Sequence, residues 1–266
     1  MPLPRVFRRL IMLGLCALLS ACATPGKDAS ARLQAVRDLA AQAHSLDNYA
    51  ELTERYRATY QREKPFLSAQ ADIGEHLMDA RRQAACDDLI TLHRAVQAYL
   101  YLLGQLAGDE RYDVEDQVKG ISSAIKAWPD TGLDERHVNA YAGLTRLLAR
   151  ALTQGYQDRS VQALLREGAA PMQTLLDAMR TLLRYYAKTN ANEARIVLGV
   201  LEVEIPFADT PRDRLLGVLG KELLQTKQAE YRLIGRRYTL TERSLDELAR
   251  QHLELLTRLD PASPHP

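Results

Sequence analysis

Apolar residues recur at intervals of three and four positions along most of the chain, which is the spacing of one face of an α-helix. The first such stretch runs from Leu33 to Leu46. A second continues after an expected break at residues 45–48 and ends at Pro65; its apolar face carries Tyr49, Leu52, Tyr56 and Tyr60. Tyrosines at this spacing predict the edge of a core.

A long helix is predicted over residues 66–107, with Gly108 as the residue that ends it. Its apolar stripe includes Leu67, Met78, Leu89 and Leu103. Arg81 and Arg82 interrupt the stripe, so we expect the helix to kink or leave the core there.

The remaining pattern predicts several shorter helices. These cover residues 112–127, 133–156, 158–167, a stretch from Pro171 to about Tyr186, and 194–205. Gly168 is expected to stop one of them, and Asn190 with Glu193 has the spacing of a capping box before the next. Thr210-Pro211-Arg212-Asp213 is a strong start signal, and Thr239 with Glu242 is expected to restart a final helix that runs to Leu259.

The composition agrees with this pattern, because Leu and Ala are abundant while the 266 residues include only 14 Gly and 11 Pro. We therefore expect an all-α fold, an elongated bundle of long antiparallel helices forming a single domain over residues 31–260. Asp130 and Gly168 are the candidate seams, and residues 261–266 are expected to form a disordered tail. No 34-residue tetratricopeptide pattern recurs, which argues against a solenoid.

The amino terminus carries the strongest motif. Arg5, Arg8 and Arg9 precede an apolar run from Leu10 to Leu19, which is too short to span a bilayer comfortably. Leu19-Ser20-Ala21-Cys22 follows and resembles the lipobox of bacterial lipoproteins.

That resemblance implies cleavage before Cys22, diacylation of its thiol and acylation of the new amino terminus. Residues 1–21 would then be a signal peptide, and residues 22–30 a flexible tether. Several acyl chains hold a protein on a membrane far longer than one chain does. Ala23 stands where an Asp is associated with inner-membrane retention in Gram-negative lipoproteins, so the resemblance favours a lipid anchor on the periplasmic face of the outer membrane.

The formal charge of the chain is +1, which gives no electrostatic case for nucleic acid as a partner. Loss of the leader and acylation of Cys22 leave Cys86 as the remaining thiol. No internal disulfide is then possible, and Cys86 is predicted to be a small core residue.

Motifs for nucleotide loops, nucleophile elbows, zincins, redox pairs and di-iron sites are absent from the mature sequence, so we expect no cofactor and no enzyme activity. Asp72, His76, Asp79 and Cys86 share a helix face and have side chains that bind Zn²⁺ or copper, but a solvated polar face is the preferred interpretation. The acidic residues Asp109, Glu110, Asp113, Glu115 and Asp116 lack the order of a calcium loop and suit a helix start instead.

One basic surface is a candidate for partner binding. Lys221, Arg232, Arg236 and Arg243 align on the last long helix, with Tyr231 and Tyr238 beside them. Guanidinium groups and aromatic rings together bind phosphate, carboxylate or an acidic protein. Glu222, Glu230 and Glu242 lie nearby, so an ordinary salt-bridged surface is the preferred interpretation of these residues.

These features predict a non-enzymatic lipoprotein that is anchored in the outer membrane and acts as a scaffold or assembly accessory for another envelope protein. The alternative is a periplasmic helical bundle that binds a small apolar or anionic molecule, which an internal cavity would favour. An envelope enzyme is the third hypothesis; it would require a buried cluster of histidines and carboxylates with shifted pKa values.

Overall fold

The computed structural model describes residues 25–109, 118, 120–121, 124–153, 160–208 and 210–259. These residues are almost entirely helical, and the β-type pairing among them is one isolated bridge between Trp128 and Leu133. The expected all-α fold class is confirmed. None of the helices in these ranges combines the length and the apolar composition that a membrane crossing requires.

Between residues 25 and 109 the structure has four α-helices separated by short turns. Helix α2 (Pro25–Ala41) leads through the 3₁₀ turn η1 (Gln42–Leu46) into α3 (Asp47–Arg57), α4 (Thr59–Glu63), the 3₁₀ turn η2 (Lys64–Phe66) and α5 (Ala69–Leu106). The expected break near residue 46 is therefore confirmed. The prediction of a tether over 22–30 is wrong from Pro25 onward, because α2 begins there, and proline is well tolerated at the first position of a helix.

The second half is built from longer helices. The 3₁₀ turn η3 (Pro129–Thr131) precedes α7 (Glu135–Thr153), which is followed by α8 (Ser160–Glu204), the 3₁₀ turn η4 (Ile205–Phe207) and α9 (Arg214–Leu259). Helix α8 packs against α7 and α9, and α5 packs against α2, α3, α7 and α8.

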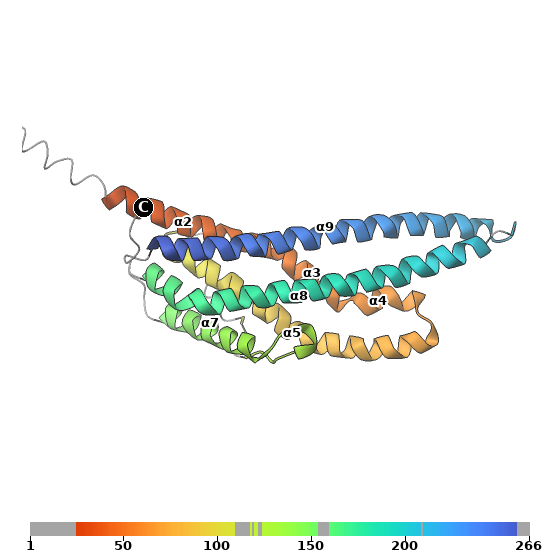
Figure 1. Cartoon of the computed structure of the whole chain (residues 1–266), viewed down its shortest axis with the longest axis horizontal. Coiled ribbons are helices and arrows are strands. Elements are labelled where there is room, and N and C mark those ends of the chain that lie inside the picture. Colours follow the sequence, from red (N-terminus) through yellow and green to blue (C-terminus); the bar gives the residue numbers. More distant parts are fainter. Residues whose placement is uncertain are drawn as a thin grey trace, which may run out of the picture.

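The molecule is elongated along its helices (Figure 1). Helices α8 and α9 form a long antiparallel hairpin, and their connection lies at one end of the molecule, past the turn between α4 and α5. Helix α2 begins and α9 ends at the opposite end (Figure 1). An elongated bundle of antiparallel helices was expected, and this arrangement confirms it.

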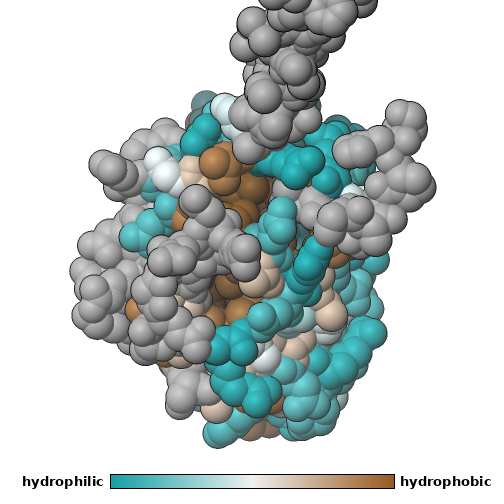
Figure 2. Space-filling view, turned by 90° about the vertical axis from the view of Figure 1, so that its left-hand side faces the viewer, coloured by the Kyte–Doolittle hydropathy of each residue, from teal (hydrophilic) through white to brown (hydrophobic). Residues whose placement is uncertain are grey.

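The core is a continuous column of leucine, alanine and tyrosine side chains between these helices. Tyr49, Tyr56 and Tyr60 are all buried, as their spacing predicts, and the ring of Tyr56 stacks on that of Tyr186 at 4.5 Å between centroids. Cys86 is fully buried, which confirms it as a core residue. At the end of the bundle where α2 begins, hydrophobic residues are visible in the middle of the face, with hydrophilic residues above and to the right of them (Figure 2).

Helices α8 and α9 are continuous where the sequence predicts interruptions. Helix α8 passes through Gly168, Pro171 and the pair Asn190 and Glu193, and α9 passes through Thr239. Gly168 does not end a helix; it allows α5 to approach α8, because a Cβ there would lie 2.5 Å from Cε2 of Tyr99. Thr239 donates its hydroxyl to the backbone oxygen of Gly235, which a threonine inside a helix commonly does.

Other predicted boundaries are confirmed. Gly108 has φ +80°, and the amides of Gly108 and Asp109 donate to the carbonyls of Gln105 and Gly104 at 3.0 Å, so α5 ends in a Schellman motif. Before α9, the amide of Asp213 donates to Oγ1 of Thr210 at 3.2 Å as the start signal predicts, although residues 211–213 form a turn and the helix itself begins at Arg214 instead of Pro211.

Helix α5 leaves the core as the interruption at Arg81 and Arg82 predicts. Arg82 is its first buried residue, and Ile73, Leu77 and Met78 before it are exposed. Met78 is therefore not a core residue, contrary to its place in the predicted stripe. Of the helix predicted over 112–127, residues 124–127 are not helical and most of the rest lies outside the described residues.

Candidate functional site

The predicted basic surface divides in the structure. Lys221, Arg232, Arg236 and Arg243 are exposed on α9, and none of them ion-pairs with another residue that the structure describes. Two of the three acidic residues that were expected to neutralise them are engaged elsewhere: Glu230 pairs with Arg55 and Lys227, and Glu242 pairs with Arg184. Glu222 is exposed on α9. Within the described part of the chain these four residues therefore do not form the salt-bridged surface that was the preferred interpretation.

Tyr231 and Tyr238 do not belong to the exposed basic surface. Only 8% of Tyr231 and 6% of Tyr238 is exposed, because both side chains face α8 rather than solvent. With Arg232 they line one wall of an open groove of about 600 Å³ between α8 and α9. Tyr231 and Tyr238 are close to the basic residues in sequence, but they lie on the inner face of α9 instead of its exposed face.

A second exposed feature was not predicted. Seven large apolar residues are exposed at the end of α8, in η4 and at the start of α9, and we call them the hairpin tip: Val203, Phe207, Leu215, Leu216, Val218, Leu219 and Leu223. Phe207 is 77% exposed and Leu215 is 68% exposed. Clusters of exposed apolar side chains on this scale mark surfaces that bind a partner.

Glycines on the inner side of α9 allow the two halves of this tip to pack closely. A Cβ on Gly217 would lie 3.1 Å from the backbone oxygen of Ala208, and a Cβ on Gly220 would lie 2.9 Å from Cγ1 of Ile205. On its inner face α9 thus contacts the segment that follows α8 through these glycines, while the leucines of the same two turns point outward. The leucines are therefore not used for packing within the hairpin.

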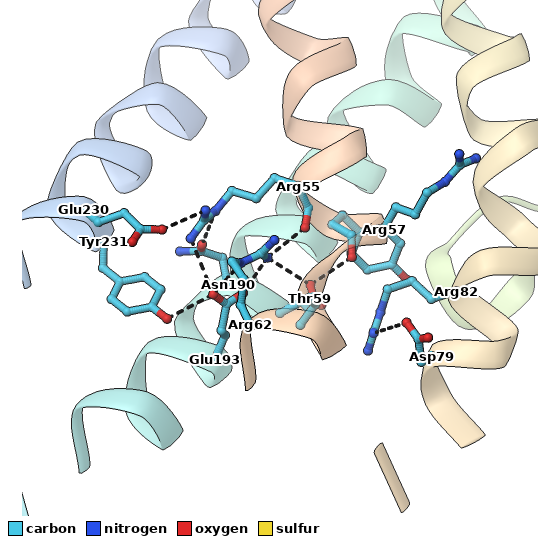
Figure 3. A network of polar contacts seen from close by, with 12 residues as sticks. Arg55, Arg57, Thr59, Arg62, Asp79, Arg82, Asn190, Glu193, Glu230 and Tyr231 are labelled. Atoms are coloured by element: carbon cyan, nitrogen blue, oxygen red, sulfur yellow. Dashed lines mark hydrogen bonds and ion pairs between the residues drawn. The ribbon is translucent and has the colours of Figure 1, made fainter. Parts of the chain in front are cut away.

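A buried polar network joins the hairpin to α3 and α4 (Figure 3). Glu193 on α8 is its centre, with a side chain that is 0% exposed. Arg62 donates from Nε and an Nη to the two oxygens of Glu193 at 2.8 and 2.7 Å, and Tyr231 on α9 donates its hydroxyl at 3.0 Å. A two-pronged guanidinium–carboxylate pair is among the stronger polar contacts in proteins.

Arg55 on α3 extends the network toward α9. Its Nε donates to Oδ1 of Asn190 at 3.0 Å, one Nη reaches Glu193 at 3.5 Å, and the other lies 2.9 Å from Glu230. Burial alone would lower the pKa of Arg62, but its hydrogen bonds with Glu193 and the charge of that carboxylate raise it. Burial and the same carboxylate raise the pKa of Tyr231, which keeps its hydroxyl a donor.

A cleft of about 500 Å³ opens on the other side of α4, between α5 and α8. Tyr56, Tyr185 and Trp128 line it together with Arg82 and Glu63, and we call it the Glu63 cleft. Arg82 lies 2.6 Å from Glu75 and 3.2 Å from Asp79, with its guanidinium 5.6 Å from the centroid of the Tyr56 ring.

Glu63 is the least satisfied polar group of this region. It is 2% exposed, and its Oε2 is buried with no hydrogen-bond partner among the described residues. Burial raises the pKa of Glu63 to about 7, and the neighbouring carboxylates of Glu75 and Glu193 add to the effect against Arg82 and Arg62.

The candidate metal ligands of the sequence are not brought together. Asp72 accepts from the hydroxyl of Tyr60 at 2.8 Å, the ring of His76 packs on Tyr60, and Asp79 binds Arg82. Cys86 is buried away from them, and burial raises its pKa, so it stays a thiol at neutral pH. No group of three or more metal-binding side chains occurs among the residues that the structure describes.

Several predictions fall outside the described residues. These are the lipobox with Cys22, the signal peptide over 1–21, the tail over 261–266 and the acidic residues from Glu110 to Asp116. Asp109, which begins the acidic run, is buried at the end of α5.

The polar network was missed because its spacing was interpreted as a helix start. Asn190 and Glu193 do have the spacing of a capping box, but positions three apart also share a helix face. They continue the core stripe of α8 between Tyr186 and Val197, which are both buried. The sequence signal for a buried network was therefore the presence of polar residues at positions of the α8 stripe that are otherwise apolar.

Comparisons with known protein families, with curated proteins and with solved structures give no match for this chain. The candidate sites therefore rest on their own geometry.

Proposed function

We propose that this protein is a non-enzymatic lipoprotein, anchored by Cys22 in the outer membrane, that binds another envelope protein through its hairpin tip. The observation that carries the proposal is the apolar surface at the tip, whose leucines point away from the hairpin. Placing the contact there, rather than on the basic residues of α9, is a change from the site expected from the sequence.

The position of the tip supports this role. The tip lies at the end of the molecule opposite the start of α2, which follows the proposed anchor (Figure 1). Helix α9 has 46 residues and therefore spans about 69 Å at 1.5 Å per residue. An anchored chain would hold the tip several nanometres from its own attachment point, a useful position for contacting a partner.

The network around Glu193 supports the same role, because a projecting hairpin must be fixed to the body to present its tip in one orientation. Arg55 and Arg62 reach Glu193 from α3 and α4, and Tyr231 reaches it from α9. Beyond the network, a small second core of Val197, Leu201 and Tyr231 packs with Leu224 and Ile205 and continues toward the tip.

Photo-crosslinking in cells tests the proposal. A crosslinkable residue at position 215 or 219 should yield one discrete adduct with an envelope protein. The double variant Leu215→Glu and Leu219→Glu, probed from position 207, should lose that adduct while keeping its helical content and membrane fraction. The matched control is Leu253→Glu, an exposed leucine near the other end of α9.

Absence of an adduct from the tip, or an adduct that survives the double variant, would contradict the proposal. An adduct from position 236 alone would show that the partner contacts the basic surface instead of the tip.

The groove between α8 and α9 supports the alternative function, a bundle that binds a small apolar or anionic molecule. Arg184 and Arg232 flank the apolar side chains of Leu183 and Leu198 in this groove. If this is the function, Arg232→Ala abolishes retention of a small molecule that co-purifies with the mature protein, and the tip variants leave it unchanged.

A further inference from the structure

We propose that the Glu63 cleft binds a small organic cation, a primary amine whose ammonium group is held by the carboxylate of Glu63 and whose carbon chain lies against Tyr56, Tyr185 and Trp128. This site is separate from the hairpin tip, so it does not depend on the partner-binding role proposed above. The cleft has the volume of an ordinary small-molecule site and combines apolar walls with a few polar groups.

The carboxylate of Glu63 is the group that points to a ligand. It lines the cleft and is buried, yet its Oε2 lacks a partner within the described residues. Buried polar groups in folded proteins are almost always hydrogen-bonded, because leaving one unpaired costs free energy. A donor brought by a ligand would satisfy this oxygen.

The charges around Glu63 favour a cation over a neutral donor. Arg62 from α4 is held by both oxygens of Glu193 on α8, and Arg82 from α5 is shared by Glu75 and Asp79. When Glu63 is ionised, the cleft is lined by three carboxylates, those of Glu63, Glu75 and Asp130, and by the guanidinium groups of Arg81, Arg82 and Arg195. Arg82 is shared by Glu75 and Asp79, Arg81 lies 4.0 Å from Asp130, and among the described residues no cation forms an ion pair with Glu63, so an ammonium group would give this carboxylate a partner of its own.

The aromatic residues fit the same kind of ligand. The faces of aromatic rings attract cations, and Arg82 already lies over the ring of Tyr56 in this way. Tyr185 meets Tyr56 edge-on at 5.8 Å between centroids, and Met78 and Ile196 complete the apolar lining. A methylene chain would bury its carbons on these residues.

The proposal is tested by calorimetric titration of the purified full-length mature protein at pH 8 with linear primary amines and diamines of two to six carbons. The alcohols of the same length are the neutral controls. We expect at least one amine to bind and its alcohol to bind at least tenfold more weakly, because hydrogen bonds to charged groups are the stronger ones. Affinity should fall below pH 7, where a proton on Glu63 competes with the ligand.

Two variants locate the site, and one serves as the control. Glu63→Gln keeps the size of the side chain and should weaken amine binding at least tenfold. Thr189→Leu fills the cleft while leaving Glu63 intact, and should abolish binding with unchanged helical content. Glu202→Gln removes an exposed carboxylate of α8 outside the cleft and should bind like the parent. No binding by any amine of the series, equal binding of amines and alcohols, or full affinity in Glu63→Gln would overturn the proposal.

Discussion

The carboxylate of Glu193 accepts hydrogen bonds from three elements at once: from Arg55 on α3, Arg62 on α4 and Tyr231 on α9. A fully buried carboxylate is stable only with partners of this kind, because removing its charge from water is costly. At the scale of residues, this one side chain fixes how α8 lies against the first half of the chain.

Replacement of Glu193 by alanine should lower the free energy of unfolding by about 3–5 kcal/mol, because the largely buried guanidinium group of Arg62 would lose its carboxylate partner, whereas Arg55 would keep Glu230. Glu242→Ala is the matched control, since its ion pair with Arg184 is partly exposed and should cost less than about 1 kcal/mol. Urea denaturation followed by circular dichroism measures both. Equal losses for the two variants would show that Glu193 contributes no more than a surface pair.

His252 makes stability depend on pH in the acid range. Its Nε2 lies 3.0 Å from the hydroxyl of Tyr99, and its Nδ1 lies 3.3 Å from Nε2 of Gln173. Burial lowers the pKa of His252 to about 4, from an ordinary 6.5. The unfolded chain therefore binds the extra proton first as pH falls, and stability should drop between pH 6.5 and 4. His252→Gln should flatten this part of the curve, as denaturation at several pH values would reveal.

Glu63 has the opposite effect on stability, which should fall as the pH rises. Because burial raises its pKa from 4.5 to about 7, the folded protein holds the proton more tightly than the unfolded chain. Stability contributed in this way is complete below pH 4.5 and is lost as pH rises through 7. Glu63→Gln should thus unfold at a higher urea concentration than the parent at pH 8, and the gain should shrink toward pH 4.5. A gain independent of pH would mean that ionisation of Glu63 is not its cause.

At this scale the sequence alone predicts that some side chains are buried, but not which side chains pair with each other. Burial of Tyr49, Tyr56, Tyr60 and Cys86 followed from helical spacing and is confirmed. Arg55 and Arg62 could not be singled out, because their partner Glu193 lies on a helix more than a hundred residues away in sequence. Glu63 could not be singled out either, because the walls of its cleft come from α5 and α8. Pairings at that distance depend on how the helices are arranged, and one sequence does not specify this arrangement.

At the scale of elements, the helix ends that are found in the structure are set by local signals in the sequence. Other predicted ends do not occur, because packing between helices keeps the helix continuous there. The Schellman motif at Gly108 and the cap at Thr210 are made by neighbouring residues, so the sequence predicts them well. Gly168 and Pro171 are also signals for an end, yet α8 continues through both. Contacts along α5, α7 and α9 stabilise the helix enough to offset the weak propensity of these two residues.

The contact between α5 and α8 at Gly168 should be sensitive to a single methyl group. Gly168→Ala would place Cβ 2.5 Å from the ring of Tyr99 and should destabilise the protein by about 1–3 kcal/mol. Gly74→Ala in α5 is the matched control: nothing lies within 4 Å of its Cβ, so alanine should stabilise by about 0.5–1 kcal/mol. Thermal denaturation measures the opposite signs, and stabilisation by both changes would contradict close packing at Gly168.

At the scale of the whole molecule, an elongated single bundle was expected from long apolar stripes without a central linker, and Figure 1 agrees. The exposed hairpin tip could not be predicted, because leucines at helical spacing are the usual sign of a core. Leu215, Leu219 and Leu223 follow that spacing but face outward, since α9 extends past the body of the bundle there.

The proposed anchor makes a prediction at the same scale. Cys22→Ala should release the protein from the membrane fraction and remove the acyl mass from its amino terminus, while thermal stability stays unchanged because Cys22 precedes α2, where the described bundle begins. Fractionation, mass spectrometry and thermal denaturation measure the three outcomes. Membrane retention of the variant would refute the anchor and, with it, the proposed outer-membrane location.

The opposite placement of the start of α2 and the hairpin tip also has a mechanical consequence. A tensile load applied between these two ends acts along the helix axes, so it shears the interfaces of the α8–α9 hairpin with α2, α3 and α5 instead of peeling them apart. In shear, all contacts of an interface resist together, whereas in peeling they fail one after another. The bundle should withstand a larger force when stretched from end to end than when α9 is pulled sideways from its last turn.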